Sequence, residues 1–350
     1  MSKPVSIIAD SLPFKPERYI MSPSFSNHYS RGVEVSEKLC TIVQRIFTSA
    51  VHISNISPLD GHLHPLCLIS LSNGAHVLLK CTPTPMTPLL RREQFILDTE
   101  ARALALLKES GIPDIPQIFY YNSRGNLRDS AFLMRHYVTG ATLHEMKPWL
   151  TPQNRKDIDR RLGVLAQKIG QHVSDSFGTL EQVASGAGRR SWREAFVILF
   201  ESILRDSEDV FVNLPYAEIR HQLSRLSPAL EEITSPQLVV IDFGHPTQVL
   251  VDPESKKLSG VVDLGKTLWG DIYMAEMFEE PSSSMLDGFG QSRIVGSEME
   301  RIRQLLYVLL YACYRSVERV TVQYYRNRDM IAENDARRRL TTILNKMAAI

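Results

Sequence analysis

The sequence has little of several features that would mark a specialised class of protein. Its four cysteines stand far apart, with no Cys-x-x-Cys or Cys/His spacing, which argues against a disulfide scaffold and a zinc site. Lysine plus arginine total 40 against 39 acidic residues, so the net charge of +1 lacks the basic excess typical of a nucleic-acid binder. No window approaches an 18-residue apolar run, and the N-terminus lacks a signal-peptide pattern, so we expect no membrane segment and a cytoplasmic location.

Length and composition predict a globular chain with two parts. Hydrophobic residues make up 43% of its 350 residues, more than one compact core usually holds. Strand patterns and one long helix fill the first part, whereas helical patterns dominate the second. We therefore predict an α+β fold with an irregular arm at residues 1–30, a smaller sheet-containing lobe at 31–138 and a larger helical lobe at 139–350. A cleft between two lobes is a common place for a ligand site.

The smaller lobe has clear local signals. Apolar residues at helical spacing predict a helix within Val33–Val51 and a longer one over Leu90–Ser110. Two short apolar runs joined through Asn73 and Gly74 predict a hairpin, because Asn-Gly favours a tight turn. The predicted strands are Leu66–Leu71, His76–Cys81, Ile115–Tyr121 and Ser130–Val138.

The larger lobe is mainly helical in its periodicity. One β-like insert, Leu238–Val262, turns near Pro253–Lys257. The predicted helices are Pro152–Asp175, Ser191–Ser207, Tyr216–Ile233 and the stretch from Ser297 to the end. The insert interrupts these helices and holds the most informative residues of the chain.

Two aspartates follow apolar runs at the ends of this insert. Asp242 ends the run Leu238–Ile241, and Asp263 ends the run Val261–Val262. An aspartate at a strand end is more often a turn residue than a catalyst, but here two come paired, and we expect one hairpin to bring them together. Phosphoryl transfer uses such a pair, one carboxylate to orient the acceptor hydroxyl and the other to hold a magnesium ion.

These residues resemble the catalytic and metal loops of the aminoglycoside phosphotransferase and choline kinase-like families. The family pattern is roughly His-Gly-Asp-x-x-x-x-Asn, then a strand, then Asp-x-Gly. Asp263-Leu-Gly is similar to the metal-binding triplet, and Trp269-Gly-Asp is similar to the Trp-Gly-Asp continuation. The resemblance implies that Asp242 is the general base or orienting carboxylate and that Asp263 binds magnesium.

Other features follow in family order from about Ile53 to Met277, and they imply a two-lobed protein-kinase-like fold that uses ATP and Mg²⁺. Lys80, near the end of a predicted strand, is similar to the lysine that contacts the nucleotide phosphates, and Glu100 is similar to its helix partner. The segment around residues 132–140 looks like the hinge that receives adenine through backbone groups. Its adenine-binding residues would be Met134, Arg135, His136 and Tyr137.

The chain departs from the family pattern in the catalytic loop. The family's asparagine lies five positions after the aspartate, where this chain has Thr247, with Gln248 next. Thr247 or Gln248 is therefore expected to supply the second metal contact, with altered geometry. The turn expected over the phosphates, Ser57–His62, contains a single glycine and offers few backbone amides to a phosphate.

Some of these residues also have ordinary structural interpretations. Lys80 could be an edge-strand lysine of the kind that guards against aggregation, and Glu93 is a rival to Glu100 as its partner. His245 is expected to bond to the backbone of its loop rather than to take part in chemistry.

The expected function is ATP-dependent phosphorylation of a hydroxyl on a small-molecule acceptor. We expect a monomer or homodimer with no nucleic-acid or membrane partner. The altered catalytic loop favours an alternative from a different class, a pseudokinase that binds a nucleotide or ligand without phosphoryl transfer. A third hypothesis keeps the fold but repurposes its chemistry, for example in specialised metabolism. Nothing in the sequence identifies the acceptor.

Overall fold

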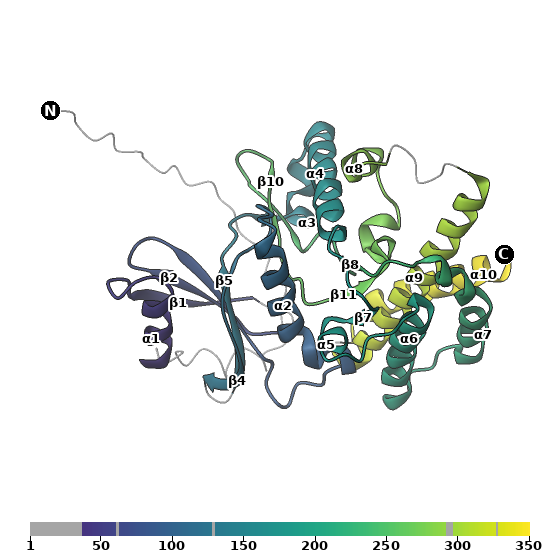
Figure 1. The fold of residues 1–350 in the computed structure, drawn as a ribbon, viewed down its shortest axis with the longest axis horizontal. Coiled ribbons are helices and arrows are strands. Elements are labelled where there is room, and N and C mark those ends of the chain that lie inside the picture. Colours follow the sequence, from purple (N-terminus) through teal and green to yellow (C-terminus); the bar gives the residue numbers. More distant parts are fainter. Residues whose placement is uncertain (1–36, 61–62, 128–129, 292–296, 327) are drawn as a thin grey trace.

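The protein has a sheet-containing part and a mainly helical part, which lie side by side (Figure 1). The structure, a computed structural model, describes residues 37–60, 63–127, 130–291, 297–326 and 328–350. The predicted arm at residues 1–30 lies outside this range. The α+β, two-lobed kinase-like architecture predicted from the sequence is confirmed, whereas the lobe boundary at residue 138 stays a prediction.

A five-stranded antiparallel sheet forms the first part, in the order β1-β2-β3-β5-β4. Its strands are β1 (Ile53–Leu59), β2 (Leu66–Leu71), β3 (His76–Cys81), β4 (Ile118–Leu127) and β5 (Ser130–His136). The predicted β2–β3 hairpin is present, and Gly74 takes the positive φ of 82° that its turn requires. Helix α1 (Glu37–Ile46) packs on one sheet face, and α2 (Ile96–Glu109) packs on the other.

Three details of this part differ from the sequence-based expectation. Strand β1 was not predicted, because its polar residues and Pro58 hide the alternation of apolar and polar residues typical of a strand. The strand also includes half of the segment Ser57–His62 that was expected to be a turn. Helix α1 ends at Ile46, before the end of the helical pattern at Val51. The long helix expected from Leu90 begins with a 3₁₀ segment, η1 (Arg91–Phe95), before α2 starts.

The second part is built mainly from helices, as expected. The longest are α4 (Pro152–Gly170), α6 (Trp192–Asp209), α7 (Tyr216–Leu226), α9 (Glu298–Tyr325) and α10 (Met330–Ala348). Short elements join them: β6 (Ala141–Thr142), α3 (Leu143–Met146), η2 (Lys147–Trp149), β7 (Gly178–Thr179), α5 (Leu180–Ala184), η3 (Ser227–Glu232), η4 (Ile272–Met274), η5 (Glu276–Phe278) and α8 (Ser283–Phe289). The stretch from Ser297 to the end is therefore two helices, because the helical backbone ends at Arg326 and Asp329 caps α10.

The strand pairing around the two aspartates differs from the single hairpin that we expected. Strand β9 (Val249–Val251) does form a hairpin with β10 (Leu258–Val261), but β8 (Gln237–Val240), which leads to Asp242, belongs to another sheet. There β8 pairs with β11 (Thr267–Gly270), which follows Asp263. The two loops meet because Ile241 N–H donates to the Lys266 carbonyl at 3.0 Å. The strand after Asp263, rather than the one before it, therefore binds the strand that leads to Asp242.

The main hydrophobic core runs without a break from α2 into the helical part. It includes Leu97 and Ala101 of α2, Leu133 of β5, and Val240 and Leu264 beside the two aspartates. A second, smaller core lies under α1 on the far face of the sheet. The apolar face of α2 therefore packs against both parts, and the burial of this face stabilises their association.

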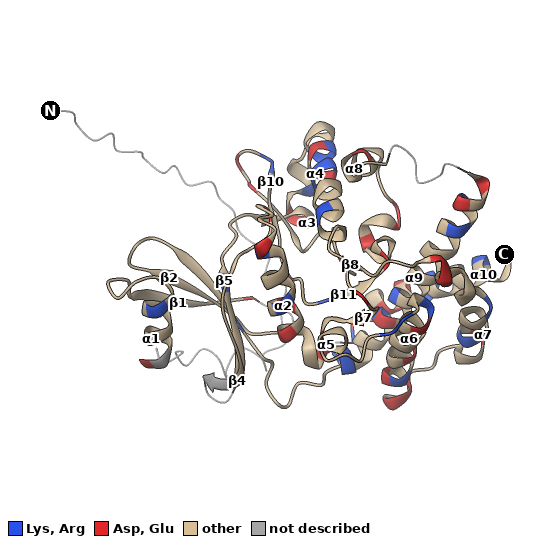
Figure 2. Ribbon diagram, in the orientation of Figure 1, with Lys and Arg blue, Asp and Glu red and all other residues tan. Residues whose placement is uncertain are grey.

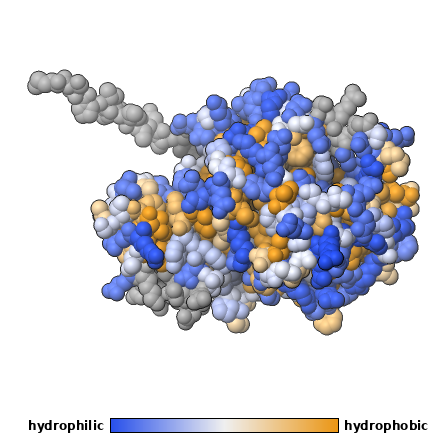
Figure 3. All heavy atoms as spheres, in the orientation of Figure 1, coloured by the Kyte–Doolittle hydropathy of each residue, from blue (hydrophilic) through white to orange (hydrophobic). Residues whose placement is uncertain are grey.

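Charged residues of both signs and apolar residues are mixed in the view of Figures 2 and 3. Acidic and basic residues alternate along most helices (Figure 2), and apolar patches are interspersed with polar ones on the visible face (Figure 3). Among the described residues, no helix is long and apolar enough to cross a membrane.

Candidate functional site

Lys80 and Glu100 form the buried ion pair that was expected of them. Successive side chains of a strand point to opposite faces, so Lys80 of β3 and Arg135 of β5 both face α2, opposite to Leu79 and its core. Lys80 Nζ lies 2.6 Å from Glu100 Oε2, and the Glu100 side chain is completely buried. Arg135 Nε lies 3.3 Å from the other Glu100 oxygen, so Glu100 is shared by two cations. The rival partner Glu93 pairs with Arg326 instead.

Asp263 joins this pair from the other part of the molecule. Its Oδ1 lies 2.7 Å from Lys80 Nζ, while half of its side chain (51%) remains exposed. Burial alone would raise the pKa of Asp263, but the charge and hydrogen bond of Lys80 lower it to about 2, so this carboxyl is ionised at neutral pH. Lysine, glutamate and aspartate from a strand, a helix and a loop thus meet at one point.

The backbone around Asp263 is held in an unusual shape. Asp263 has a φ of 67°, in the left-handed region that residues other than glycine rarely adopt, and such conformations cluster at functional sites. Gly265 is required for a different reason: a Cβ there would come within 2.5 Å of the Ile96 side chain at the start of α2. This loop therefore passes against α2 with no room for a larger residue.

Asp242 lies on the helical side of the same region. Its Oδ2 accepts a hydrogen bond from Gln248 Nε2 at 2.8 Å and lies 3.5 Å from Lys266 Nζ. Its Oδ1 is buried and has no hydrogen-bond partner in the part of the chain that the structure describes. Burial raises the pKa of Asp242, Lys266 opposes that rise, and the nearby Asp263 charge adds to it.

The two candidates for the second metal contact occupy different places. Thr247 is exposed, and its hydroxyl lies 2.8 Å from His245 Nδ1. Gln248 points toward Asp242, and its side-chain oxygen is buried with no hydrogen-bond partner among the residues described. Gln248, one position later than the family asparagine, is therefore the residue that lies next to Asp242. His245 bonds within its own loop, as expected.

The oxygen atoms at this site are of the kind that binds a magnesium ion, although the described acidic side chains do not form a complete set of metal ligands. Among the described residues, no group of three or more His, Cys, Asp or Glu side chains is arranged to hold a metal. Asp263 nevertheless offers a half-exposed carboxylate, and the Gln248 and Asp242 oxygens are orphaned acceptors. Mg²⁺ prefers such oxygen ligands and usually completes its shell with water and substrate phosphates. The residues present thus fit the ion.

The segment expected to receive adenine, residues 134–137, is partly hydrogen-bonded within the sheet. Met134 is buried in the core under α1, and the Arg135 side chain is held by Glu100. The backbone N–H of His136 donates to the Gln117 carbonyl at 2.8 Å, and that of Tyr137 lies 3.4 Å from the His76 carbonyl. The remaining backbone groups of residues 134–137 lie at the junction of the two parts, and their contact with adenine stays a prediction.

Several residues of the site gave no recognisable signal in the sequence. Lys266 lies between Asp242 and Glu318 of α9, 3.5 and 3.4 Å from their oxygens, and Arg92 of η1 lies 3.2 Å from the same glutamate. The signal available was the position of Lys266 just before β11, three residues after Asp263. Its contact with Asp242, however, depends on a strand pairing that we did not expect.

His64 is a second residue that sequence analysis overlooked. It is buried in the loop between β1 and β2 and lies within electrostatic reach of Lys80 and Asp263. Burial and, to a smaller degree, the charge of Lys80 lower its pKa to about 3, so the imidazole is neutral at physiological pH. His64 lies two residues after the turn Ser57–His62 that was expected to cover the phosphates.

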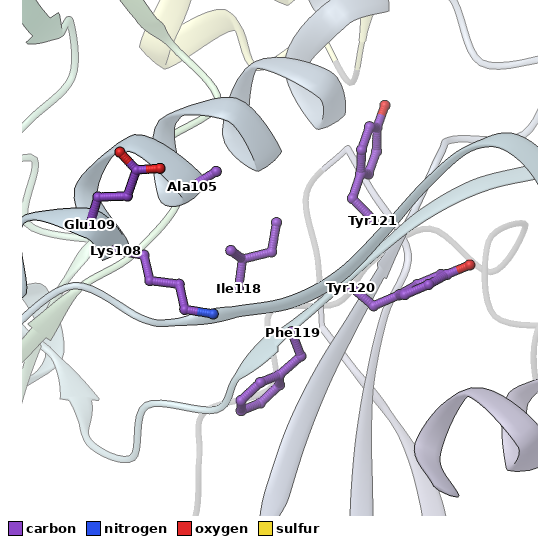
Figure 4. Close-up of a pocket in the computed structure, with 7 residues that line it drawn as sticks. All are labelled: Ala105, Lys108, Glu109, Ile118, Phe119, Tyr120 and Tyr121. Carbon is purple, nitrogen blue, oxygen red and sulfur yellow. The ribbon is translucent and has the colours of Figure 1, made fainter. Parts of the chain in front are cut away.

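A shallow hollow of about 550 Å³ lies elsewhere, between α2 and β4 (Figure 4). Its lining includes Lys108, Glu109, Tyr120 and Tyr121. It shares no residue with the group around Lys80 and Asp263 and plays no part in the site.

Comparison with solved structures places this arrangement in a known fold. A thermostable mutant of aminoglycoside phosphotransferase APH(4)-Ia, in ternary complex with AMP-PNP and hygromycin B, has a TM-score of 0.58 and 16% identity, over 89% of this chain and 100% of that chain. The streptomycin-ATP-APH(2")-IIa ternary complex has a TM-score of 0.56 and 14% identity, over 89% and 99%. A candidate fructosamine-3-kinase from Thermobifida fusca has a TM-score of 0.61 and 16% identity, also over 89% and 99%. At these identities the likeness concerns the fold.

Sequence comparison identifies the family. No curated protein matches the chain. The family model described as the phosphotransferase enzyme family matches residues 89–275, more than half of the chain. The match begins after Lys80 and includes Glu100, Asp242 and Asp263. The chain therefore belongs to the phosphotransferase enzyme family.

Proposed function

We propose that the protein transfers the γ-phosphoryl group of ATP to a hydroxyl of a small molecule. The family and the kinase fold support a small-molecule phosphotransferase. One observation carries the finer proposal: Lys80 Nζ lies 2.6 Å from Glu100 and 2.7 Å from Asp263. A lysine held by a helix glutamate beside an aspartate of a metal loop is the arrangement that phosphoryl transfer by kinases requires.

Each residue would have one task in the reaction. Lys80 would hold the nucleotide phosphates, with Glu100 fixing the direction of its ammonium group. Asp242 would orient the acceptor hydroxyl through its free Oδ1 and take its proton. As the acceptor oxygen forms its bond to the γ-phosphorus, the bond from that phosphorus to the β,γ-bridging oxygen breaks, and ADP leaves. The products are the phosphorylated acceptor, ADP and one proton.

Asp263 and Gln248 would hold a magnesium ion, which would neutralise the charge of the phosphates. Thr247 takes no part in this assignment, because its side chain is exposed and bonded to His245. The Asp263 carboxylate is the one charged ligand of the two. It therefore contributes most of the attraction for the cation.

The adenine would lie against the backbone of residues 134–137, where the sheet joins the helical part. The acceptor would then approach from the helical side, because Asp242 lies there. Hydrogen bonds through backbone groups would not depend on the side chains of these residues.

Calorimetric titration with ATP, with and without Mg²⁺, followed by a phosphate-transfer assay on a panel of hydroxylated small molecules, tests the proposal. We expect magnesium-dependent nucleotide binding and transfer to at least one class of acceptor. The pseudokinase alternative predicts binding of a nucleotide or ligand with no turnover of any compound. A protein that binds no nucleotide under either condition would overturn the proposal outright.

A further inference from the structure

Lys266 stands beside Asp242 as a consequence of strand register. In the β8–β11 pair, Thr267 lies opposite Val240, so the residue before Thr267 lies beside the residue after Val240. The Ile241 N–H donates to the Lys266 carbonyl at 3.0 Å. This bond fixes the backbone of Lys266 beside Ile241, the residue before Asp242. The backbone thus places Lys266 next to Asp242, and no flexible loop separates them.

The Lys266 side chain is held at both sides. Its ammonium lies 3.5 Å from Asp242 Oδ2 and 3.4 Å from Glu318 Oε1. The Glu318 side chain is only 8% exposed and also pairs with Arg92 at 3.2 Å, so it is a fixed anchor. The Lys266 side chain itself is 30% exposed, so its ammonium is not sealed in the core.

The two oxygens of Asp242 therefore have different surroundings. Oδ2 faces two donors, Gln248 Nε2 at 2.8 Å and Lys266 Nζ at 3.5 Å. Oδ1 is buried and has no hydrogen-bond partner among the described residues. A carboxylate held on one oxygen by a hydrogen bond and an ion pair cannot rotate freely, and its other oxygen stays unpaired. Catalytic groups need such orientation, because small misplacements cost large factors in rate.

We propose that Lys266 is a positioning residue that holds the Asp242 carboxylate so that Oδ1 meets the acceptor. This inference rests on the proposed function. Lys266 reaches Asp242 from the turn that also carries Asp263, so one four-residue segment supplies the metal ligand and the counter-charge of the other aspartate. A purely structural lysine would contribute to stability and leave turnover per folded molecule unchanged.

The test uses ATP hydrolysis, with water as the acceptor, because the natural acceptor is unidentified. Lys266→Met keeps the length and apolar stem of the side chain and removes its charge. We expect kcat to fall roughly 10- to 100-fold while KM for Mg·ATP stays within about threefold, since the nucleotide contacts are made elsewhere. Lys266→Arg keeps the charge and should recover most of the lost kcat.

Lys257→Met is the matched control, because Lys257 is an exposed lysine in the nearby β9–β10 turn. It should leave both parameters unchanged. If Lys266→Met does not fold, Lys266→Gln takes its place with the same expected loss.

The possible outcomes separate this inference from the proposed function. Wild-type turnover that survives in folded Lys266→Met would overturn the inference and leave the function standing. An equal fall in the Lys266→Arg variant would overturn it too, because charge would then not be the relevant property. A wild-type protein that transfers phosphate from Mg·ATP neither to water nor to any acceptor of the panel would overturn both.

Discussion

Arg326, just after α9, holds both carboxylate oxygens of Glu93, in the 3₁₀ segment before α2. Arg91 and Arg92, the two residues before Glu93, form ion pairs with Asp206 of α6 and Glu318 of α9. Three consecutive residues thus tie the start of α2 to the helical part. Because α2 carries Glu100, these contacts bear on the position of the Lys80–Glu100 pair.

A double-mutant cycle on this contact should show strong coupling. Glu93 is 6% exposed, and both its oxygens are paired, so Glu93→Gln and Arg326→Gln should not be additive. We expect a coupling free energy of about 2 kcal/mol from urea unfolding. The exposed Asp335–Arg338 pair, 3.8 Å apart, is the control and should show no measurable coupling. Equal behaviour of the two pairs would contradict the proposed tie.

Removing Glu100 should destabilise the protein more than removing Lys80. Glu100→Gln leaves the buried cations Lys80 and Arg135 without their shared carboxylate, and breaking such a pair costs about 3 kcal/mol or more. Lys80→Met should cost less, because Glu100 keeps Arg135 and Asp263 remains half exposed to water. The free energy of unfolding of both variants in urea tests this order. A larger loss of unfolding free energy in Lys80→Met than in Glu100→Gln would show that the ion pair between Arg135 and Glu100 does not offset the removal of Lys80.

Gln248, not Thr247, should control magnesium dependence. Gln248→Leu removes the donor to Asp242 and the orphaned oxygen, so we expect turnover to fall about 10-fold or more and the magnesium requirement to rise. Thr247→Val breaks only the contact with His245 and should leave the magnesium titration unchanged. The opposite pattern would move the metal contact to Thr247. Gln248→Asn, which restores the family residue, should raise turnover if the departure merely weakens a metal contact.

The site shows where prediction from sequence works and where it stops. Lys80 and Glu100 were identified because a strand followed by a helix has a fixed local order, and their side chains do meet. Asp242 and Asp263 were predicted from the same kind of order, and their roles stay predictions. Lys266 was not predicted, because its contact with Asp242 depends on β8 pairing with β11 rather than on the hairpin that the sequence suggested.

The fold shows the same division. Strongly periodic elements such as α4 and the β2–β3 hairpin followed from local patterns. Strand β1, with few apolar residues, and the two-residue strands β6 and β7 exist only through tertiary pairing. The break between α9 and α10 was missed because neither proline nor glycine marks it, and Asp329 caps the new helix instead.

Asp271 should make stability fall as the pH rises from about 4 to about 6. This carboxyl is 2% exposed and accepts hydrogen bonds from Tyr311 Oη at 2.9 Å and Tyr273 N at 3.0 Å. Burial raises its pKa to about 6 in spite of these bonds. Between the ordinary carboxyl pKa and 6, the folded protein binds more protons than the unfolded chain, so deprotonation favours unfolding.

The Asp271 contribution can be isolated by comparison with Asp271→Asn. Across this pH window, the free energy of unfolding of the wild type should fall by on the order of 2–3 kcal/mol relative to that of the variant. Urea unfolding at several pH values between about 4 and 7 measures it. Parallel pH profiles for the two proteins would show that Asp271 titrates normally.

The two aspartates should differ in what their removal destroys. Asp263→Ala removes the charged metal ligand, so it should abolish phosphoryl transfer and also weaken magnesium-dependent nucleotide binding. Asp242→Ala should spare nucleotide binding and lower turnover by roughly 100-fold or more, because its proposed contact is the acceptor hydroxyl. Asp175→Asn, at an exposed position after α4, is the control and should change neither. Calorimetry with and without Mg²⁺, together with a phosphate-transfer assay on all variants, separates the two roles. Equal turnover in wild type and Asp263→Ala would mean that the metal is held elsewhere, whereas a loss of nucleotide binding in folded Asp242→Ala would place that carboxylate among the nucleotide or metal contacts.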